Sequence, residues 1–154
     1  MPRRKLRYRL NVAGMLMTPG GDLLICERLN LPGAWQFPQG GVDRGESLEE
    51  AITRELSEEI GITADQWIER RQSGPFRYDF EENRLIRGYS GKDQHFFLLE
   101  YLDDPLAIDV HQPAAEFRAF QWIQPRDFDL RWLPPSKRTM YRKVFAELLR
   151  IDLH

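Results

Sequence analysis

The sequence predicts an α/β protein in which short strands alternate with two helices. In several segments, such as residues 76–80, aromatic residues alternate with charged ones, which is typical of a half-buried strand. One apolar stripe with helical spacing is marked at both ends, by Ser47 and by Gly61. A second helical stripe follows Pro134 and Pro135, because proline favours the first turn of a helix.

Before the first helix we expect three strands. Residues 10–17 and 22–27 are largely apolar, and Pro19-Gly20-Gly21 between them predicts a hairpin turn. Residues 35–39 predict a further strand that ends in a glycine turn at Gly40 and Gly41. Glycine at this turn would let a ligand approach the backbone closely.

After the first helix we expect three more strands and the second helix. The strands are assigned to residues 76–80, 95–101 and 117–123, and residues 81–94 are assigned to a polar loop. The packing stripe of the last helix consists of Met140, Val144, Leu148 and Ile151. We expect residues 1–154 to form one domain, since a chain of this length buries about two-thirds of its unfolded surface.

The first helix carries acidic residues on its apolar side. Ser47 and Glu50 have the spacing of a capping box, so the helix is expected to begin there. At about 100° per residue, Glu55 and Glu59 fall inside the apolar arc, and Glu58 lies at its edge. The apolar arc consists of Leu48, Ala51, Ile52 and Leu56.

Three carboxylates directed toward the buried side need a positive partner. Like charges about 6 Å apart repel by roughly 3 kcal/mol per pair at an effective dielectric near 20. A divalent cation would remove this repulsion, and Mg²⁺ suits carboxylates that share it with substrate phosphates. Arg54, one turn from Glu50 and from Glu58, adds a cation at the side of the acidic face. The alternative is a solvated acidic face, which is the commoner fate of a charge run.

Residues 40–62 resemble the Nudix box, G-x5-E-x7-R-E-U-x-E-E-x-G-U, in which U is a bulky aliphatic residue. Every defined position of this motif is matched. The matching residues are Gly40, Glu46, Arg54, Glu55, Leu56, Glu58, Glu59, Gly61 and Ile62. Because so many fixed positions agree, the chain is similar to the Nudix hydrolases in its most informative segment.

This resemblance implies an α/β/α sandwich around a mixed β-sheet, and hydrolysis of a nucleoside diphosphate linked to another group. It assigns Mg²⁺ or Mn²⁺ to the carboxylates of Glu55, Glu58 and Glu59. It adds the Gly40 carbonyl oxygen as a further ligand and makes Glu46 a brace for the loop. Metal ions in such a site neutralise phosphate charge, stabilise the leaving oxygen and lower the pKa of a bound water.

The base that takes the proton of the attacking water is left open among three glutamates. Glu55 and Glu59 come from the helix. Glu116 comes from the segment Ala115-Glu116-Phe117, where a strand is expected to start.

Weaker similarities outside the box resemble the bacterial RNA pyrophosphohydrolases and dinucleoside polyphosphate hydrolases. They lie at Tyr8-Arg9, Asn11-Val12, Trp35 to Gly41, Arg77-Tyr78, Phe96 to Leu99 and Lys137-Arg138. By this resemblance, contacts to substrate phosphates fall to Arg9, Gln39, Tyr78 and Lys137, and Glu116 becomes a fourth acidic group at the metals. Arginine and lysine neutralise phosphate, while amide and phenol groups donate hydrogen bonds to it.

Two of these residues also have purely structural interpretations, and two positions depart from the subgroup pattern. Tyr78 could serve only to pack the core, and Gln39 only to tie down the glycine turn. Leu10 stands where a proline often follows the Tyr-Arg pair, and Ser136 stands where an aromatic residue could stack on a base. We therefore expect recognition of the first base to differ from that of the subgroup, because base stacking is worth about 1–3 kcal/mol.

Composition favours a soluble globular enzyme, with 42% hydrophobic and 30% charged residues. No apolar run approaches the roughly 20 residues that span a bilayer, so no membrane partner is expected. The basic N-terminus leads into an expected strand instead of a signal peptide. Cys26 is the only cysteine, which excludes a disulfide within the chain and favours a reducing cytoplasm.

Basic residues gather near both ends of the chain, where they would meet a polyphosphate if folding brings the ends to the metal face. They are Arg3, Arg4, Lys5, Arg7, Arg9, Lys137, Arg138, Arg142 and Lys143. The preferred functional hypothesis is removal of pyrophosphate from triphosphorylated RNA 5′ ends. The alternatives are hydrolysis of dinucleoside tetraphosphates, hydrolysis of free nucleoside triphosphates, and a nucleotide-binding module without catalysis. A protein activator is left open.

Overall fold

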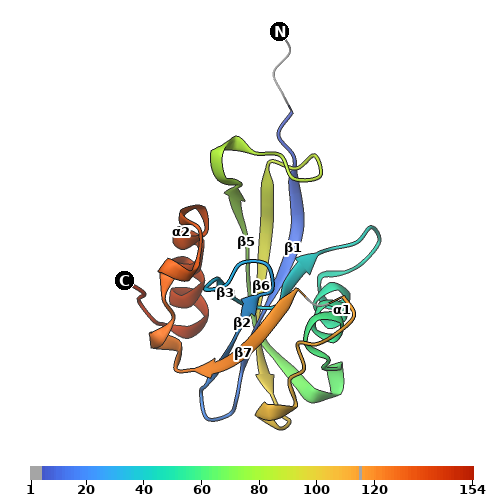
Figure 1. The fold of residues 1–154 in the computed structure, drawn as a ribbon, viewed down its shortest axis with the longest axis vertical. Coiled ribbons are helices and arrows are strands. Elements are labelled where there is room, and N and C mark those ends of the chain that lie inside the picture. The colour runs from blue at the N-terminus through green and yellow to red at the C-terminus, as the bar shows by residue number, and fades with distance from the viewer. Residues whose placement is uncertain (1–4, 115) are drawn as a thin grey trace.

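The computed structural model describes residues 5–114 and 116–154. A seven-stranded sheet has helix α1 on one face and helix α2 on the other (Figure 1). The helices are α1 (Leu48–Ile60) and α2 (Pro135–Val144), and α2 continues into a π-helical turn (Phe145–Leu149). The strands are β1 (Tyr8–Met17), β2 (Leu23–Arg28), β3 (Trp35–Gln36), β4 (Gln39–Gly41), β5 (Trp67–Asp79), β6 (Gly91–Tyr101) and β7 (Phe117–Ile123). The expected α/β/α sandwich is confirmed.

The sheet is mixed because its central strand has both kinds of neighbour. Strand β1 pairs in parallel with β6 over its whole length and antiparallel with β2 and β4. The main strand order is β3-β2-β1-β6-β5, with β4 added to β1 and β7 added to β2. The expected mixed sheet is therefore present, and its parallel pair joins residues that are more than 80 positions apart.

Two apolar cores separate the sheet from its helices. On the α1 face, Gly14 of β1 leaves the space in which Ile52 and Leu56 lie, 3.3 Å from where its Cβ would be. On the α2 face, the ring of Phe37 stacks on that of Tyr141, with centroids 5.3 Å apart. Within residues 5–114 and 116–154, no helix combines the length and the apolar character that crossing a membrane requires.

Strands β5 and β6 extend beyond the segments expected for them. The strand expected at 76–80 runs over Trp67–Asp79, and its added residues are mostly exposed. Backbone pairing with β6 holds them, so the hydrophobic pattern does not mark this edge strand. Strand β6 begins at Gly91, inside the expected loop 81–94, because it pairs with β1 from Tyr8 onward.

Gly40 and Gly41 do not form the expected turn. They belong to strand β4, which pairs antiparallel with β1, and a left-handed turn lies later, at Gly45 (φ 81°). A side chain at Gly40 would overlap the carboxyl group of Glu55, and one at Gly41 would overlap the guanidinium of Arg9. The glycines therefore make room for two charged side chains.

The remaining boundaries lie close to those expected. The hairpin strands appear as β1 and β2, and the strand expected at 35–39 divides into β3 and β4. Strand β7 coincides with the expected segment 117–123. In the stripe of the last helix, Met140, Val144 and Leu148 are buried, whereas Ile151 lies beyond the helical residues and packs at the edge of the core.

Candidate active site

Two carboxyl groups of helix α1 are buried against strand β4. The helix begins as predicted, since Ser47 Oγ accepts a hydrogen bond from Glu50 N (3.0 Å) and Glu50 Oε1 accepts one from Ser47 N (3.1 Å). From this start, Glu55 and Glu59 turn inward and are only 7% and 3% exposed. Gln39 N of β4 donates a hydrogen bond to Glu59 Oε2 at 3.2 Å.

Burial raises the pKa of both inward carboxyl groups. It is the main reason that the pKa of Glu59 rises to about 10, and the charges of Glu55 and Glu116 raise it further. The pKa of Glu55 also rises through burial, although the Arg54 guanidinium opposes the shift. A bound cation would reverse these shifts by favouring the ionised forms. The oxygen donors and their crowding fit a hard divalent metal ion.

Glu58 does not turn inward with the other two glutamates. Its side chain is 47% exposed, and Glu58 Oε2 lies 3.4 Å from Arg54 Nη1. The prediction of three inward carboxylates is therefore correct for Glu55 and Glu59 and wrong for Glu58, because position 58 lies at the rim of the apolar arc. Within the described ranges, no three acidic, histidine or cysteine side chains converge in a ready metal site. A metal ion that uses Glu58 requires its side chain to rotate.

Arg54 connects the helix to the loop that precedes it. Its guanidinium donates to both carboxylate oxygens of Glu46 and to the Gly41 carbonyl oxygen, each at 2.8 Å. It also donates to Glu55 Oε1 at 2.8 Å. The bonds to Arg54 hold the pKa of Glu46 at about 2. The expected pairing of Arg54 with Glu50 is wrong, because Glu50 is engaged in the capping box.

Three half-buried basic side chains form a group beside the site: Lys92 on β6 lies near Glu55 and Glu59, and Arg28 at the end of β2 and Lys137 at the start of α2 lie near Lys92. In the described part of the chain, none of them has an acidic partner within 4.0 Å. Burial, with the nearby charges of Lys92 and Arg28, lowers the pKa of Lys137 to about 7. Buried cations of this kind are stabilised by an anionic ligand.

Tyr78 packs in the core and lies next to Lys137. It is 6% exposed, and its ring meets that of Phe80 edge-on with centroids 6.2 Å apart. Lys137 Nζ lies 5.6 Å from the centroid of the Tyr78 ring. The Tyr78 hydroxyl is buried and has no hydrogen-bond partner among the described residues. Tyr78 therefore packs, and it also leaves a donor available to a ligand.

Gln39 belongs to a buried cluster of amide side chains beneath the site. Asn11 Nδ2 donates to Gln94 Oε1 at 2.8 Å and to Gln39 Oε1 at 3.4 Å. Asn11 and Gln94 are each 1% exposed, and Gln39 is 7% exposed. These bonds tie β1, β4 and β6 together and hold Gln39 in place, although not at a glycine turn. Its contact with a substrate phosphate stays a prediction.

The other predicted contacts are divided between the site and the surface. Arg9 Nη2 lies 3.6 Å from Asp43 Oδ1, beside strand β4. Glu116 is exposed, and its charge reaches both Glu59 and Lys92. Only some of the basic residues near the ends of the chain lie at the site. Arg138 instead donates hydrogen bonds to the carbonyl oxygens of Leu130 and Leu133. Arg142 and Lys143 are exposed on α2, and Arg3, Arg4 and Ala115 lie outside the described residues.

Comparison with known proteins now decides the family. Residues 7–144 match the sequence model of the NUDIX domain. The chain belongs to the Nudix family. A relative from Helicobacter pylori named RNA pyrophosphohydrolase is 41% identical over 150 residues, which cover 94% of this chain and 95% of the relative. A protein of the same name from Erythrobacter litoralis is 39% identical over 151 residues, covering 92% and 91% of the two chains.

A solved structure of the Caenorhabditis elegans Ap4A hydrolase shares the fold. It superposes with a TM-score of 0.67 at 22% identity, and the match covers 93% of this chain and 99% of the other. The expected membership among Nudix pyrophosphohydrolases, enzymes of phosphoanhydride bonds that generally need divalent metal ions, is confirmed.

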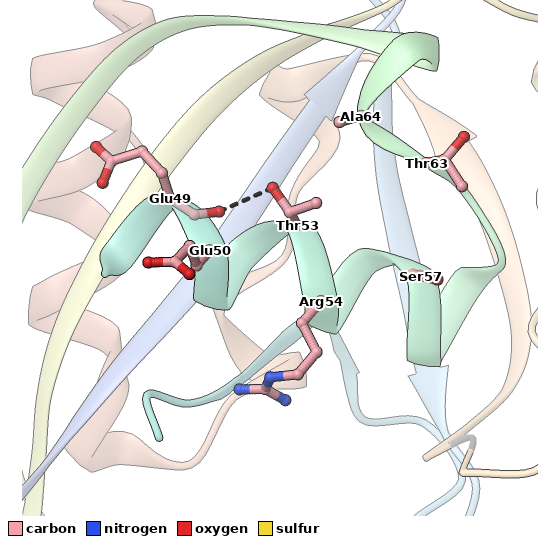
Figure 2. Close-up of a pocket in the computed structure, with 7 residues that line it drawn as sticks. All are labelled: Glu49, Glu50, Thr53, Arg54, Ser57, Thr63 and Ala64. Carbon is pink, nitrogen blue, oxygen red and sulfur yellow. Dashed lines mark hydrogen bonds between the residues drawn. The ribbon is translucent and has the colours of Figure 1, made fainter. Parts of the chain in front are cut away.

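Two hollows lie on the surface, one at the Nudix helix and one at α2. One of about 470 Å³ lies over the outer side of α1, where Figure 2 shows the Arg54 guanidinium directed away from Thr63 and Ala64. It is separate from the inward carboxyl groups. The other, of about 230 Å³, lies between β5 and α2, beside Tyr78. Its lining consists of Pro75, Phe76, Arg77, Tyr78, Ser136, Thr139, Met140 and Lys143.

Sequence reasoning missed two cations of this Nudix site, Arg28 and Lys92. Lys92 falls in the segment assigned to a loop, so its side chain could not be given a direction. Lys92, Gln94 and Phe96 are alternate residues of β6, so their side chains lie on the same face of the sheet. An expected strand that began earlier would have assigned Lys92 to that face.

Proposed function

We propose that residues 1–154 form a single Nudix domain that removes pyrophosphate from triphosphorylated RNA 5′ ends. The observation that supports this function is the closeness of two buried carboxyl groups, Glu55 and Glu59, to the half-buried Lys92, which has no acidic partner within 4.0 Å among the described residues. Lys137 adds a second half-buried cation near Lys92. A polyphosphate with its metal ions would suit both sets, since the carboxylates would hold the metal and lysines would contact phosphate oxygens. The similarity to proteins named RNA pyrophosphohydrolase favours RNA as the carrier of the polyphosphate.

The proposed cofactor is Mg²⁺ or Mn²⁺. Its ligands are the Gly40 carbonyl oxygen and the carboxylates of Glu55, Glu58, Glu59 and Glu116. When bound, the metal supplies positive charge to the phosphates and lowers the pKa of the attacking water.

The side chains of the site direct the hydrolysis. The oxygen of a water forms a bond to the β-phosphorus, and the bond from this phosphorus to the oxygen shared with the α-phosphate breaks, with its electron pair remaining on that oxygen, which stays on the RNA. One of Glu55, Glu59 and Glu116 takes the proton of the water. Arg9 and Lys137 hold the phosphate oxygens, and the Tyr78 hydroxyl donates a hydrogen bond to the chain of phosphates.

The hollow between β5 and α2 suits a nucleoside adjoining the phosphates. Phe76 and Met140 provide apolar surface, and Arg77 and Lys143 provide positive charge at the same hollow. Ser136 also lines it and offers a hydroxyl group instead of an aromatic face, so stacking on the base is left to Phe76 and Tyr78. The buried Cys26 is consistent with action in a reducing cytoplasm.

Substrate comparison tests the proposed function directly. Triphosphorylated RNA, diadenosine tetraphosphate and GTP are compared at matched concentrations with excess Mg²⁺. We expect monophosphorylated RNA as product, with kcat/KM for the RNA at least about tenfold above that for GTP. Preference for the dinucleotide, cleaved to a triphosphate and a monophosphate, would instead support the alternative of a dinucleoside tetraphosphate hydrolase. Absence of turnover on all three would support a nucleotide-binding module.

Changing Gly40 of strand β4 to alanine should displace the Glu55 carboxyl group and so lower activity. A methyl group at this position would overlap the Glu55 carboxyl, which cannot withdraw easily because Arg54 and the core surround it. Gly40→Ala is therefore expected to lower kcat by about 100-fold, a loss that a 1 Å misplacement of a catalytic group can cause. The matched control is Gly20→Ala, since the nearest atom to its Cβ would be Thr18 Oγ1 at 3.8 Å. Equal activity in both variants would contradict the assigned position of Glu55.

A further inference from the structure

Lys92 lies in the middle of a row of polar side chains that crosses three strands. In the sheet register, Lys92 of β6 is paired with Arg9 of β1 on one side and with Tyr78 of β5 on the other. Residues paired in register project from the same face of a sheet, so these three side chains are neighbours. The face is the one covered by α2, because Tyr78 and Phe96 pack in the core on that side.

Lys92 also stands between the acidic and the basic parts of the site. Burial lowers the pKa of its ammonium group, whereas Glu116, Glu59 and Glu55 are near enough to raise it. Its charge in turn is one reason that the pKa of Lys137 is low. Among the described residues no ion pair or side-chain hydrogen bond occupies the Lys92 ammonium group, which therefore keeps its donors for a ligand.

We propose that Lys92 is a catalytic residue whose ammonium group contacts the phosphate undergoing attack, between the carboxylates and Lys137. This inference rests on the proposed function in taking a polyphosphate as the substrate. Arg9 and Tyr78, its neighbours in the row, contact the phosphates on either side. Negative charge on the attacked phosphate is redistributed as the bond to the leaving group breaks, and a fixed cation at this point stabilises that change.

A competing explanation is that Lys92 only neutralises Glu116 and the buried glutamates. That role would affect folding and metal binding without distinguishing a triphosphate from a monophosphate. A contact with the phosphate chain makes the opposite prediction. The decisive measurement is therefore the preference of the enzyme for a triphosphate end, in addition to its turnover.

The test compares Lys92→Gln and Lys92→Arg with the wild type. Turnover is measured on triphosphorylated RNA, and binding is measured with RNA whose α- and β-phosphates are joined by a methylene group and with monophosphorylated RNA. For Lys92→Gln we expect kcat to fall roughly 100-fold and the preference for the triphosphate analogue to fall roughly tenfold. Lys92→Arg, which keeps the charge, should recover most of the preference. Arg126→Gln removes an equal charge from an exposed position and should match the wild type.

The outcomes separate this inference from the proposed function. If the wild type hydrolyses another polyphosphate but not the RNA, the proposed function is wrong, and the same variants are measured on the substrate that it does hydrolyse. If Lys92→Gln keeps kcat within twofold, or weakens binding of both RNAs equally, the assignment of Lys92 is overturned. Lys92→Met keeps the aliphatic chain and replaces Lys92→Gln if that variant does not fold.

Discussion

Replacing Glu58 by glutamine is expected to abolish most turnover while leaving the fold intact. The Glu58 side chain is 47% exposed, and its one ion pair with a described residue, Arg54, is 3.4 Å long, so its charge contributes little to folding. We expect the free energy of unfolding without metal to change by less than about 0.5 kcal/mol. With Mg²⁺ and triphosphorylated RNA, kcat should fall roughly 10²–10³-fold, because a charge that acts on the transition state is lost.

The matched control for this change lies on the same helix. Glu49 is exposed and accepts a hydrogen bond from Gln72, which the amide oxygen of a glutamine can also accept. Glu49→Gln should therefore keep turnover within about twofold of the wild type, since it removes the same charge about two and a half turns from Glu58. Full activity in Glu58→Gln would show that the inward pair Glu55 and Glu59 suffices for the metal, and that Glu58 stays directed to solvent during the reaction.

The sequence was most informative where the interactions are local. The start of α1 depends on Ser47 and Glu50, three residues apart, and their hydrogen bonds have the expected pattern. The inward direction of Glu55 and Glu59 follows from helical periodicity alone. The direction of the Glu58 side chain could not be predicted from periodicity, which gives only the angle of a residue around the helix. At the edge of the apolar arc, the ion pair with Arg54 decides which way the side chain lies.

Features that depend on strand register could not be predicted in this way. Asn11 and Gln94 are 83 residues apart in sequence, and only the parallel pairing of β1 with β6 brings them to 2.8 Å. The same pairing places Lys92 beside Arg9, although Lys92 belonged to an expected loop. Gly40 and Gly41 were assigned to a turn because glycine is common there, but their lack of a side chain serves Glu55 and Arg9 instead.

Glu59 should make the stability of the metal-free protein fall as pH rises. Its carboxyl group has a pKa of about 10 in the folded chain. In the unfolded chain an ordinary glutamate has a pKa of about 4.3, so between these values the folded state holds a proton that the unfolded state has released. The free energy of unfolding therefore decreases with pH in this window, by at most about 1.4 kcal/mol per pH unit. Urea unfolding with a chelator at pH 6, 7, 8 and 9 measures this slope.

Glu59→Gln removes the titrating group and should flatten the slope. At pH 8 the metal-free variant should be more stable than the wild type, because an amide at this buried position takes up no proton on folding, whereas Glu59 must. Adding Mg²⁺ should narrow the difference: at one hundred times its Kd the metal raises the stability of the wild type by about 2.7 kcal/mol, and the variant, lacking a ligand, gains less. Glu49→Gln again serves as the control and should keep the wild-type slope. Equal slopes in all three proteins would mean that Glu59 is ionised in the metal-free fold, and that bound metal is not needed to balance its charge.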